Sequence, residues 1–166
     1  VVMKNATVNA KHGSPDRTLQ IGEINLECYV LEDGRRVLLY ADVQRAIGLA
    51  DGGSMVAGKT RLEQFVSGTR LARTIGPSVR ELLAAPNHIH KPGGQVSYAL
   101  EAEILPAICE AVVEAARMGI LQEQQLFVAH QCEVILSGLS RVGIIALVDE
   151  ATGFQKFRQE DELRRI

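Results

Sequence analysis

Eight residues, Gly53-Ser-Met-Val-Ala-Gly58-Lys59-Thr60, match the pattern G-x-x-x-x-G-K-[ST] of phosphate-binding loops. In that pattern backbone amides surround nucleotide phosphates, while the lysine and the hydroxyl serve the terminal phosphate and Mg²⁺. The chemistry needs a buried parallel strand that leads straight into the loop, whereas the residues before Gly53 have the pattern of a short helix. No later apolar strand ends in an aspartate that would hold the metal. Nucleotide binding is therefore a remote alternative, and we expect Thr60 to cap a helix instead.

Histidines and cysteines offer no complete metal site. His88 and His90 are two residues apart, so both would point to the same face of a strand, a spacing that zinc and copper sites use. Two ligands do not make a site, and we expect these histidines on the surface of a hairpin. His130 and Cys132 would lie on different faces of a helix. The sequence therefore predicts no bound metal.

Asp149 and Glu150 are the remaining residues suited to acid–base chemistry. Two carboxylates at the C-terminal end of a helix oppose its dipole, so they need cationic partners or a helix that continues. A catalytic acid pair is one interpretation, and the simpler one is a junction at Gly153 followed by a polar helix over residues 156–166. Because serine, histidine and aspartate occur in no nucleophile signature, we expect no enzyme and no cofactor.

The composition is that of a globular chain with one domain. Of the 166 residues, 46% are hydrophobic and 23% are charged, which is enough apolar material for a core. The three cysteines are odd in number and far apart, so we expect reduced thiols. No apolar stretch approaches the ~20 residues that span a bilayer, and the start lacks a signal-peptide segment. We expect a soluble, cytoplasmic protein outside membranes, with residues 1–20 as a mobile tail and 21–150 as the domain.

Turn and capping residues divide the first hundred residues into short elements. Asp33-Gly34 and Pro92-Gly93-Gly94 each separate two β-rich runs, as in hairpins. Thr60-x-x-Glu63 and Ser78-x-x-Glu81 fit the capping box at the start of a helix. The expected elements are, in order, a hairpin of residues 24–31 and 35–40, helices over 41–47, 60–67 and 79–85, and a hairpin of residues 88–91 and 95–100.

The second half has the periodicity of two long helices. Residues 103–118 and a run from about Gln122 carry apolar side chains at steps of three and four. In the second run this stripe comprises Val128, Cys132, Ile135, Leu139, Val142 and Ala146. The turn from Val142 to Val148 is apolar on every side, so we expect it to be buried in the domain core or in a subunit interface. The fold class is therefore α+β with an antiparallel pair of long helices, and we expect a homodimer through the long helix.

Charge is unevenly distributed along the chain. Residues 1–100 hold 12 basic and 9 acidic side chains, a net +3, while residues 101–166 hold 6 and 11, a net −5. The basic excess is concentrated between Arg35 and Arg80, where a polyanion would bind if one binds at all. A solvated surface paired with acids of the second half accounts for the excess equally simply. The residues expected to contact phosphate are Arg35, Arg36, Arg45, Lys59, Arg61, Arg70 and Arg73.

The stretch LVDEATGFQ, residues 147–155, is the most specific motif of the chain. Together with EILPAICE (103–110) and VLEDGRRV (30–37), it resembles phage and prophage proteins that bear the so-called P-sixty-three C-terminal domain. The resemblance extends from about residue 22 to residue 158. It implies a setting among viral regulatory modules such as antirepressors, with the name-giving domain downstream of Ile166. The motif residues without an assigned role are Asp149, Glu150, Thr152, Gly153 and Gln155.

Two function classes follow from these observations. The first is a phage-derived regulatory module, not an enzyme, that binds DNA or a regulator protein through the basic segment and dimerises through its long helices. Its affinity for DNA would fall steeply with salt. The second is a protein-interaction module that sequesters a repressor without touching DNA, which fits the acidic second half and the formal net charge of −2.

Overall fold

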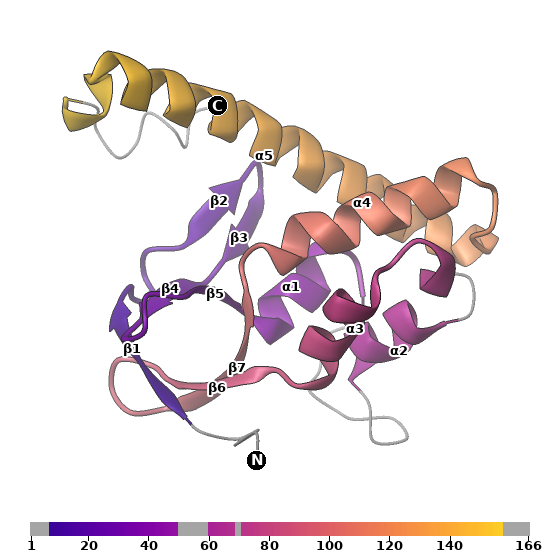
Figure 1. Ribbon diagram of the computed structural model, residues 1–166, viewed down its shortest axis with the longest axis horizontal. Coiled ribbons are helices and arrows are strands. Elements are labelled where there is room, and N and C mark those ends of the chain that lie inside the picture. Colours follow the sequence, from indigo (N-terminus) through magenta and orange to yellow (C-terminus); the bar gives the residue numbers. More distant parts are fainter. Residues whose placement is uncertain (1–6, 50–59, 69–70, 158–166) are drawn as a thin grey trace.

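Five short strands from both ends of the first hundred residues close into a barrel. The computed structural model describes residues 7–49, 60–68 and 71–157, and within them the fold is α+β (Figure 1). The barrel strands are β1 (Val8–His12), β4 (Cys28–Leu31), β5 (Arg36–Leu39), β6 (Asn87–His90) and β7 (Val96–Glu101). They neighbour one another in the order β1-β4-β5-β7-β6, and a parallel pairing of β1 with β6 closes the ring. All other barrel pairs are antiparallel.

The strands alternate between two cores. Inward-facing residues of all five strands form a small cluster centred on Tyr29, Leu31, Val37, Ile89 and Ala99. The neighbouring positions Leu38 and Leu100 face outward and join the main core under the helices. Because successive side chains of a β-strand point to opposite faces, the same strands contribute to the cluster inside the ring and to the main core outside it.

Short helices connect the hairpins, and two long ones follow them. The helices are α1 (Tyr40–Ala46), α2 (Arg61–Ser67), α3 (Pro77–Ala84), α4 (Ile104–Arg117) and α5 (Leu126–Thr152), with 3₁₀ turns η1 (Leu71–Arg73), η2 (Glu123–Gln125) and η3 (Phe154–Lys156). A two-stranded ribbon of β2 (Leu19–Ile21) and β3 (Ile24–Leu26) stands between the barrel and α5. Figure 1 shows that α4 and α5 run in opposite directions and that α5 continues well past α4.

Both expected hairpins and the expected antiparallel helix pair are confirmed. Thr60 accepts a hydrogen bond from the backbone N–H of Glu63 at 3.1 Å, so it caps α2 as its spacing predicts. Gly48 follows α1 with a positive φ of 90°, and Gly119 follows α4 with a φ of 69°. These left-handed conformations are the helix-ending geometry that glycine adopts without strain.

Two expectations at element level are wrong. Residues 8–12 form β1, which closes the barrel, instead of belonging to a mobile tail over residues 1–20. The helix predicted from Ser78 begins at Pro77 without a side-chain cap, because proline has no N–H to satisfy at the first helical position. The polar helix expected over residues 156–166 stays a prediction, because only its first two positions are described: Lys156 ends the 3₁₀ turn η3 and Phe157 follows it, while residues 158–166 lie outside the described part of the chain.

Candidate functional site

Thr60 is the one described residue of the phosphate-loop motif, and its hydroxyl is already engaged. It is hydrogen-bonded to the Tyr40 hydroxyl and to the Glu63 backbone, while buried Gln44 accepts from the Leu62 backbone N–H at 3.1 Å. Burial raises the pKa of Tyr40 to about 12, so this phenol stays protonated and available to donate. The residues before the motif form helix α1 rather than a strand, and the motif's Gly53 to Lys59 lie outside the described residues.

The paired histidines lie on the second hairpin. His88 stacks edge-on against Tyr98, its partner across the strands, with ring centroids 4.6 Å apart. His90 Nδ1 lies 3.4 Å from the carbonyl oxygen of Gly94 in the adjoining turn. In the part of the chain that the structure describes, no three histidine, cysteine or acidic side chains gather as metal ligands would.

Two of the seven residues expected to contact phosphate are bound to nearby acids. Arg35 Nε donates to Asp33 Oδ2 at 2.9 Å, and Arg45 Nη2 donates to Asp42 Oδ1 at 3.0 Å. The pKa of Asp33 is lowered, chiefly because its carboxylate accepts the backbone N–H of Arg35. For these two arginines the alternative of a solvated surface paired with acids fits better than phosphate binding. Asp33 and Asp42 are local neighbours, and Arg35 also lies 3.7 Å from Glu101 of the acidic second half, measured from Nη1 to Oε1.

The other basic residues divide between β5 and the α2–η1–α3 region. Arg36 is exposed on β5, and Arg73 is exposed at the end of η1. Arg61 on α2 and Arg80 on α3 each have a buried Nε atom with no hydrogen-bond partner among the described residues. Since α2 packs against both η1 and α3, these elements bring Arg61, Arg73 and Arg80 into one region. Lys59 and Arg70 lie outside the described residues.

The LVDEATGFQ motif forms the end of α5 and the turn after it. Thr152 Oγ1 donates to the carbonyl oxygen of Val148 at 2.8 Å, and Gly153 ends the helix with a positive φ of 78°. Asp149 is buried whereas Glu150 is exposed, so the two carboxylates do not share one environment. Gln155 is exposed in η3. The motif therefore builds a helix stop, as the junction interpretation predicts.

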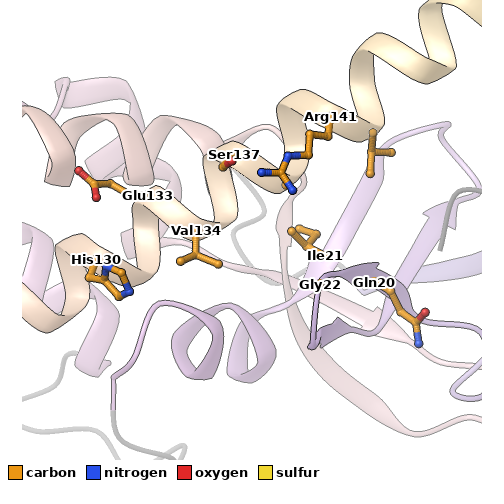
Figure 2. Close-up of a pocket in the computed structure, with 10 residues that line it drawn as sticks. Gln20, Ile21, Gly22, His130, Glu133, Val134, Ser137 and Arg141 are labelled. Atoms are coloured by element: carbon orange, nitrogen blue, oxygen red, sulfur yellow. The ribbon is translucent and has the colours of Figure 1, made fainter. Parts of the chain in front are cut away.

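A groove follows the exposed side of α5, where the β2–β3 ribbon meets it. Its volume is about 380 Å³, and Figure 2 shows its lining coming from the ribbon tip on one side and successive turns of α5 on the other. The lining residues are Gln20, Ile21, Gly22, His130, Glu133, Val134, Ser137, Gly138, Arg141 and Val142. A Cβ atom at Gly138 would come within 2.3 Å of Ile21 Cγ2, so glycine is what lets the ribbon seat against the helix.

Beyond the groove, the apolar turn that we expected to be buried is open to solvent. The side chains of Ile144, Leu147 and Val148 are 59%, 62% and 52% exposed. Burial in the core of a single chain is therefore wrong for this turn, because α5 has left α4 behind at this point (Figure 1). The other option, burial in a subunit interface, stays a prediction.

Two aromatic side chains complete this surface at the end of the helix. Phe154 and Phe157 are both exposed, Phe157 by 79%, and with Val148, Asp149 and Thr152 they line a shallow hollow of about 550 Å³. We name the groove, the apolar turn Ile144–Val148 and the aromatic turn Phe154–Phe157 together the α5 surface. The sequence indicated the apolar turn but not the rest of this surface. The signal that could have found it is a spacing of seven residues, which places the exposed side chains of Val134, Arg141 and Val148 on one face of α5.

The helix that carries this surface is also apolar and long enough, by length and composition alone, to cross a bilayer. Within the described residues it is the one segment that meets this criterion: it spans Glu123–Thr152, and an 18-residue window in it has a mean hydropathy of 1.5. This differs from the expectation that no stretch approaches such a length. Glu133 and Arg141 lie within the segment, and its first half packs on α4.

No protein-family model, curated protein or solved structure matches this chain. The described residues form an α+β domain in which a long helix, α5, extends past the barrel and α4 and ends in an exposed apolar turn.

Proposed function

We propose that this chain is a phage-derived regulatory module, not an enzyme, that works by protein–protein contact through the α5 surface, with a second copy of itself as the partner. The observation that carries the proposal is the exposure of Ile144, Leu147 and Val148 on a part of α5 that has no neighbouring helix among the described residues. Contiguous apolar patches of this kind mark interaction sites in water-soluble proteins. Covering each of these side chains is worth up to ~1.5–3 kcal/mol.

A second copy fits better than a strongly acidic or basic partner, because the apolar turn Ile144–Val148 carries no charged side chain. Arg141 and Glu150, which flank the turn in sequence, are nine residues apart and lie on opposite faces of α5. A twofold contact pairs the same apolar side chains from both copies and needs no second kind of surface.

Sedimentation velocity of the purified chain tests this proposal. We expect reversible self-association that persists between about 50 mM and about 500 mM NaCl, since apolar contacts are not screened by salt. Leu147→Asp is expected to make the chain monomeric. Leu82→Asp is the matched control, because Leu82 is an exposed leucine on α3, away from the α5 surface. A wild-type chain that stays monomeric at high concentration would overturn the proposal.

DNA binding is the second candidate function. The observation that favours it points to a smaller set of basic residues than the sequence indicated. Arg61 and Arg80 have buried Nε atoms without hydrogen-bond partners among the described residues, and exposed Arg73 lies in the same region. A buried donor without a partner costs free energy, which a phosphate oxygen would recover. This supports the α2–η1–α3 region, rather than Arg35 and Arg45, as the phosphate contact.

Fluorescence anisotropy with a mixed-sequence duplex separates the two candidates. If DNA binds through this region, Arg61→Ala combined with Arg73→Ala will weaken binding and flatten its salt dependence by about one to two units of slope. Arg45→Ala is the matched control, because Arg45 already pairs with Asp42 and is expected to change little. Absence of any salt-sensitive binding leaves protein contact as the working function.

A further inference from the structure

A second pocket, which we call the barrel pocket, lies on the outer face of the barrel at the base of the β2–β3 ribbon (Figure 1). Its volume is about 380 Å³, and Val30 on β4, Leu38 on β5 and Leu19 on β2 line it. Successive side chains of a strand point to opposite faces, so the side chains of Tyr29 and Val37, next to Val30 and Leu38 in the chain, belong to the cluster inside the ring. The barrel pocket is therefore outside the ring, and none of its lining residues belongs to α5.

Three basic side chains line the same pocket: His12, Arg17 and Arg36. Strand register places His12 and Arg36 on either side of one apolar residue, because Val30 is the partner of His12 on β1 and of Arg36 on β5. Neighbouring strands are ~4.8 Å apart, so the backbones of the two basic residues are separated by about 10 Å. All three basic residues are exposed, and no aspartate or glutamate is among the lining residues.

Arg36 has no acidic partner of its own in the part of the chain that the structure describes. Its neighbour Arg35 is bound to Asp33, whereas no ion pair or side-chain hydrogen bond joins Arg36 to another described residue. Glu101 and Glu103 line a separate hollow that Arg36 also borders, and neither of them is ion-paired with it. A guanidinium beside an apolar pocket suits a carboxylate, which it binds through two parallel hydrogen bonds.

Glycine at position 13 allows the chain to turn closely against the barrel beside this pocket. Its φ of 118° is one that other residues rarely adopt, and a Cβ atom there would lie 2.6 Å from the carbonyl oxygen of Cys28. The chain therefore leaves β1 in close contact with β4 and brings Arg17 and Leu19 to the barrel pocket.

We propose that the barrel pocket binds a small organic anion with an apolar body and one carboxylate, of the size of a medium-chain fatty acid. Val30, Leu38 and Leu19 contact the body, and Arg36 binds the carboxylate, with the charges of His12 and Arg17 nearby. At ~30 Å³ for each water-sized group, the pocket volume corresponds to about a dozen heavy atoms. An inorganic anion would leave the apolar lining uncovered, so the apolar acid fits better.

Protection of Cys28 from alkylation gives a local measurement of binding. Cys28 lines the barrel pocket, and the other two cysteines of the chain, Cys109 and Cys132, are fully buried. Burial raises the pKa of the Cys28 thiol, so alkylation of the full chain by N-ethylmaleimide is followed by mass spectrometry at about pH 8.5 to increase the thiolate fraction. We expect octanoate to protect Cys28 saturably, with half-saturation at or below about 1 mM. Absence of saturable protection would overturn the proposal.

Three further compounds show which parts of the ligand are recognised. 1-Octanol keeps the apolar body without the charge, butanoate keeps the charge on a shorter body, and inorganic phosphate has a charge and no apolar body. We expect each to protect Cys28 about tenfold or more weakly than octanoate, because each lacks apolar contacts or the charged hydrogen bonds. Equal protection by 1-octanol would overturn recognition of the anion, and equal protection by butanoate or phosphate would overturn recognition of the apolar body.

Substitution of Arg36 tests the site of the carboxylate. Arg36→Met is expected to weaken protection by octanoate about tenfold, whereas Arg36→Lys keeps the charge and is expected to retain most of it. Because Arg36 is exposed, neither change should unfold the domain, and circular dichroism checks this. Arg117→Met is the matched control, since Arg117 is an exposed arginine at the end of α4, outside the barrel pocket. Equal protection in Arg36→Met and in wild type would overturn the proposal.

The barrel pocket is independent of the proposed self-association, and one variant separates the two. Leu147→Asp changes the apolar turn of α5 and leaves the pocket residues intact. We expect octanoate to protect Cys28 equally in this variant and in wild type. Loss of protection in Leu147→Asp would instead assign octanoate to the α5 surface and overturn the barrel pocket as its site.

Discussion

The two halves of α5 have similar apolar periodicity but opposite surroundings. From Leu126 to Gly138 the helix lies on α4 and on the β2–β3 ribbon, and Val128, Cys132 and Ile135 are buried. From Leu139 to Thr152 the same stripe continues, yet Leu139, Val142 and Ala146 are only partly covered, and large apolar side chains on the other faces are exposed. A heptad pattern therefore indicates that a helix face packs against another surface, but it does not indicate whether that surface belongs to the same chain.

Truncating one side chain in each half should give the largest contrast. Ile135→Ala removes a fully buried side chain and is expected to lower the free energy of unfolding by about 2–5 kcal/mol. Leu147→Ala is expected to change it by less than about 0.5 kcal/mol in dilute solution, where the chain is monomeric. Urea denaturation measures both. Equal losses in the two variants would mean that the projecting half is packed within a single chain.

Substitution of the two glycines of α5 extends the comparison between its packed half and its exposed half to the backbone. Gly138→Ala would place a Cβ atom 2.3 Å from Ile21 Cγ2, so we expect a loss of about 1–3 kcal/mol as the ribbon is pushed away. Gly143→Ala meets nothing within 4 Å and should instead stabilise the helix by up to about 1 kcal/mol. Thermal unfolding of both variants gives the signs. A double-mutant cycle with Ile21→Ala, in which the two losses together are smaller than their sum, would identify the ribbon contact as the cause.

The substitution Gly153→Ala tests whether the last turn of α5 unfolds independently of the rest of the domain. Its positive φ of 78° makes alanine unfavourable there by ~1–2 kcal/mol. Because the position lies beyond the packed half, we expect this cost to appear as local fraying of the last turn of α5, seen by amide hydrogen exchange, with little change in global unfolding. The aromatic turn would then be less well positioned, and dimerisation would weaken by a few-fold. A matching drop in global stability would contradict the separation of the two halves.

The smallest expected effect concerns bilayers. We propose that α5 stays in water, as expected for a cytoplasmic protein, and that its apolarity serves helix pairing. Flotation with neutral phosphatidylcholine vesicles should therefore recover no protein, since Arg141 near the middle of a spanning segment would cost ~2.5–3.5 kcal/mol. Flotation of the wild type that is abolished by Leu147→Asp would instead assign the apolar turn to a lipid surface.

Local signals made much of the fold predictable. Asp33-Gly34 and Pro92-Gly93-Gly94 mark hairpin turns, and Thr60 marks the start of α2, because each acts through contacts within a few residues. Closure of the barrel was not predictable, since Val8–His12 pairs with a strand some eighty residues later. Its sequence, VNAKH, is polar and alternating, and only the partners β4 and β6 make it a strand.

The candidate site was less predictable than the fold. Asp33 and Asp42 are within three residues of Arg35 and Arg45 in the chain, but these ion pairs depend on turn and helix geometry that composition does not give, and the pair of Arg35 with Glu101 depends on the pairing of β5 with β7. The groove depends on contact between Ile21 and Gly138, which are remote in sequence. The apolar turn was found correctly, but periodicity cannot distinguish a domain core from an interface between copies.

Closure of the barrel also determines how this domain can fail. Each of its five strands has neighbours on both sides, so among the described strands the ring has no free edge and the short β2–β3 ribbon alone has open ones. Loss of β1, through a nick before Gly13 or a deletion of the residues before it, would leave the edges of β4 and β6 unpaired at once. Exposed strand edges recruit other strands, so a protein built to assemble through helices would then aggregate through its sheet.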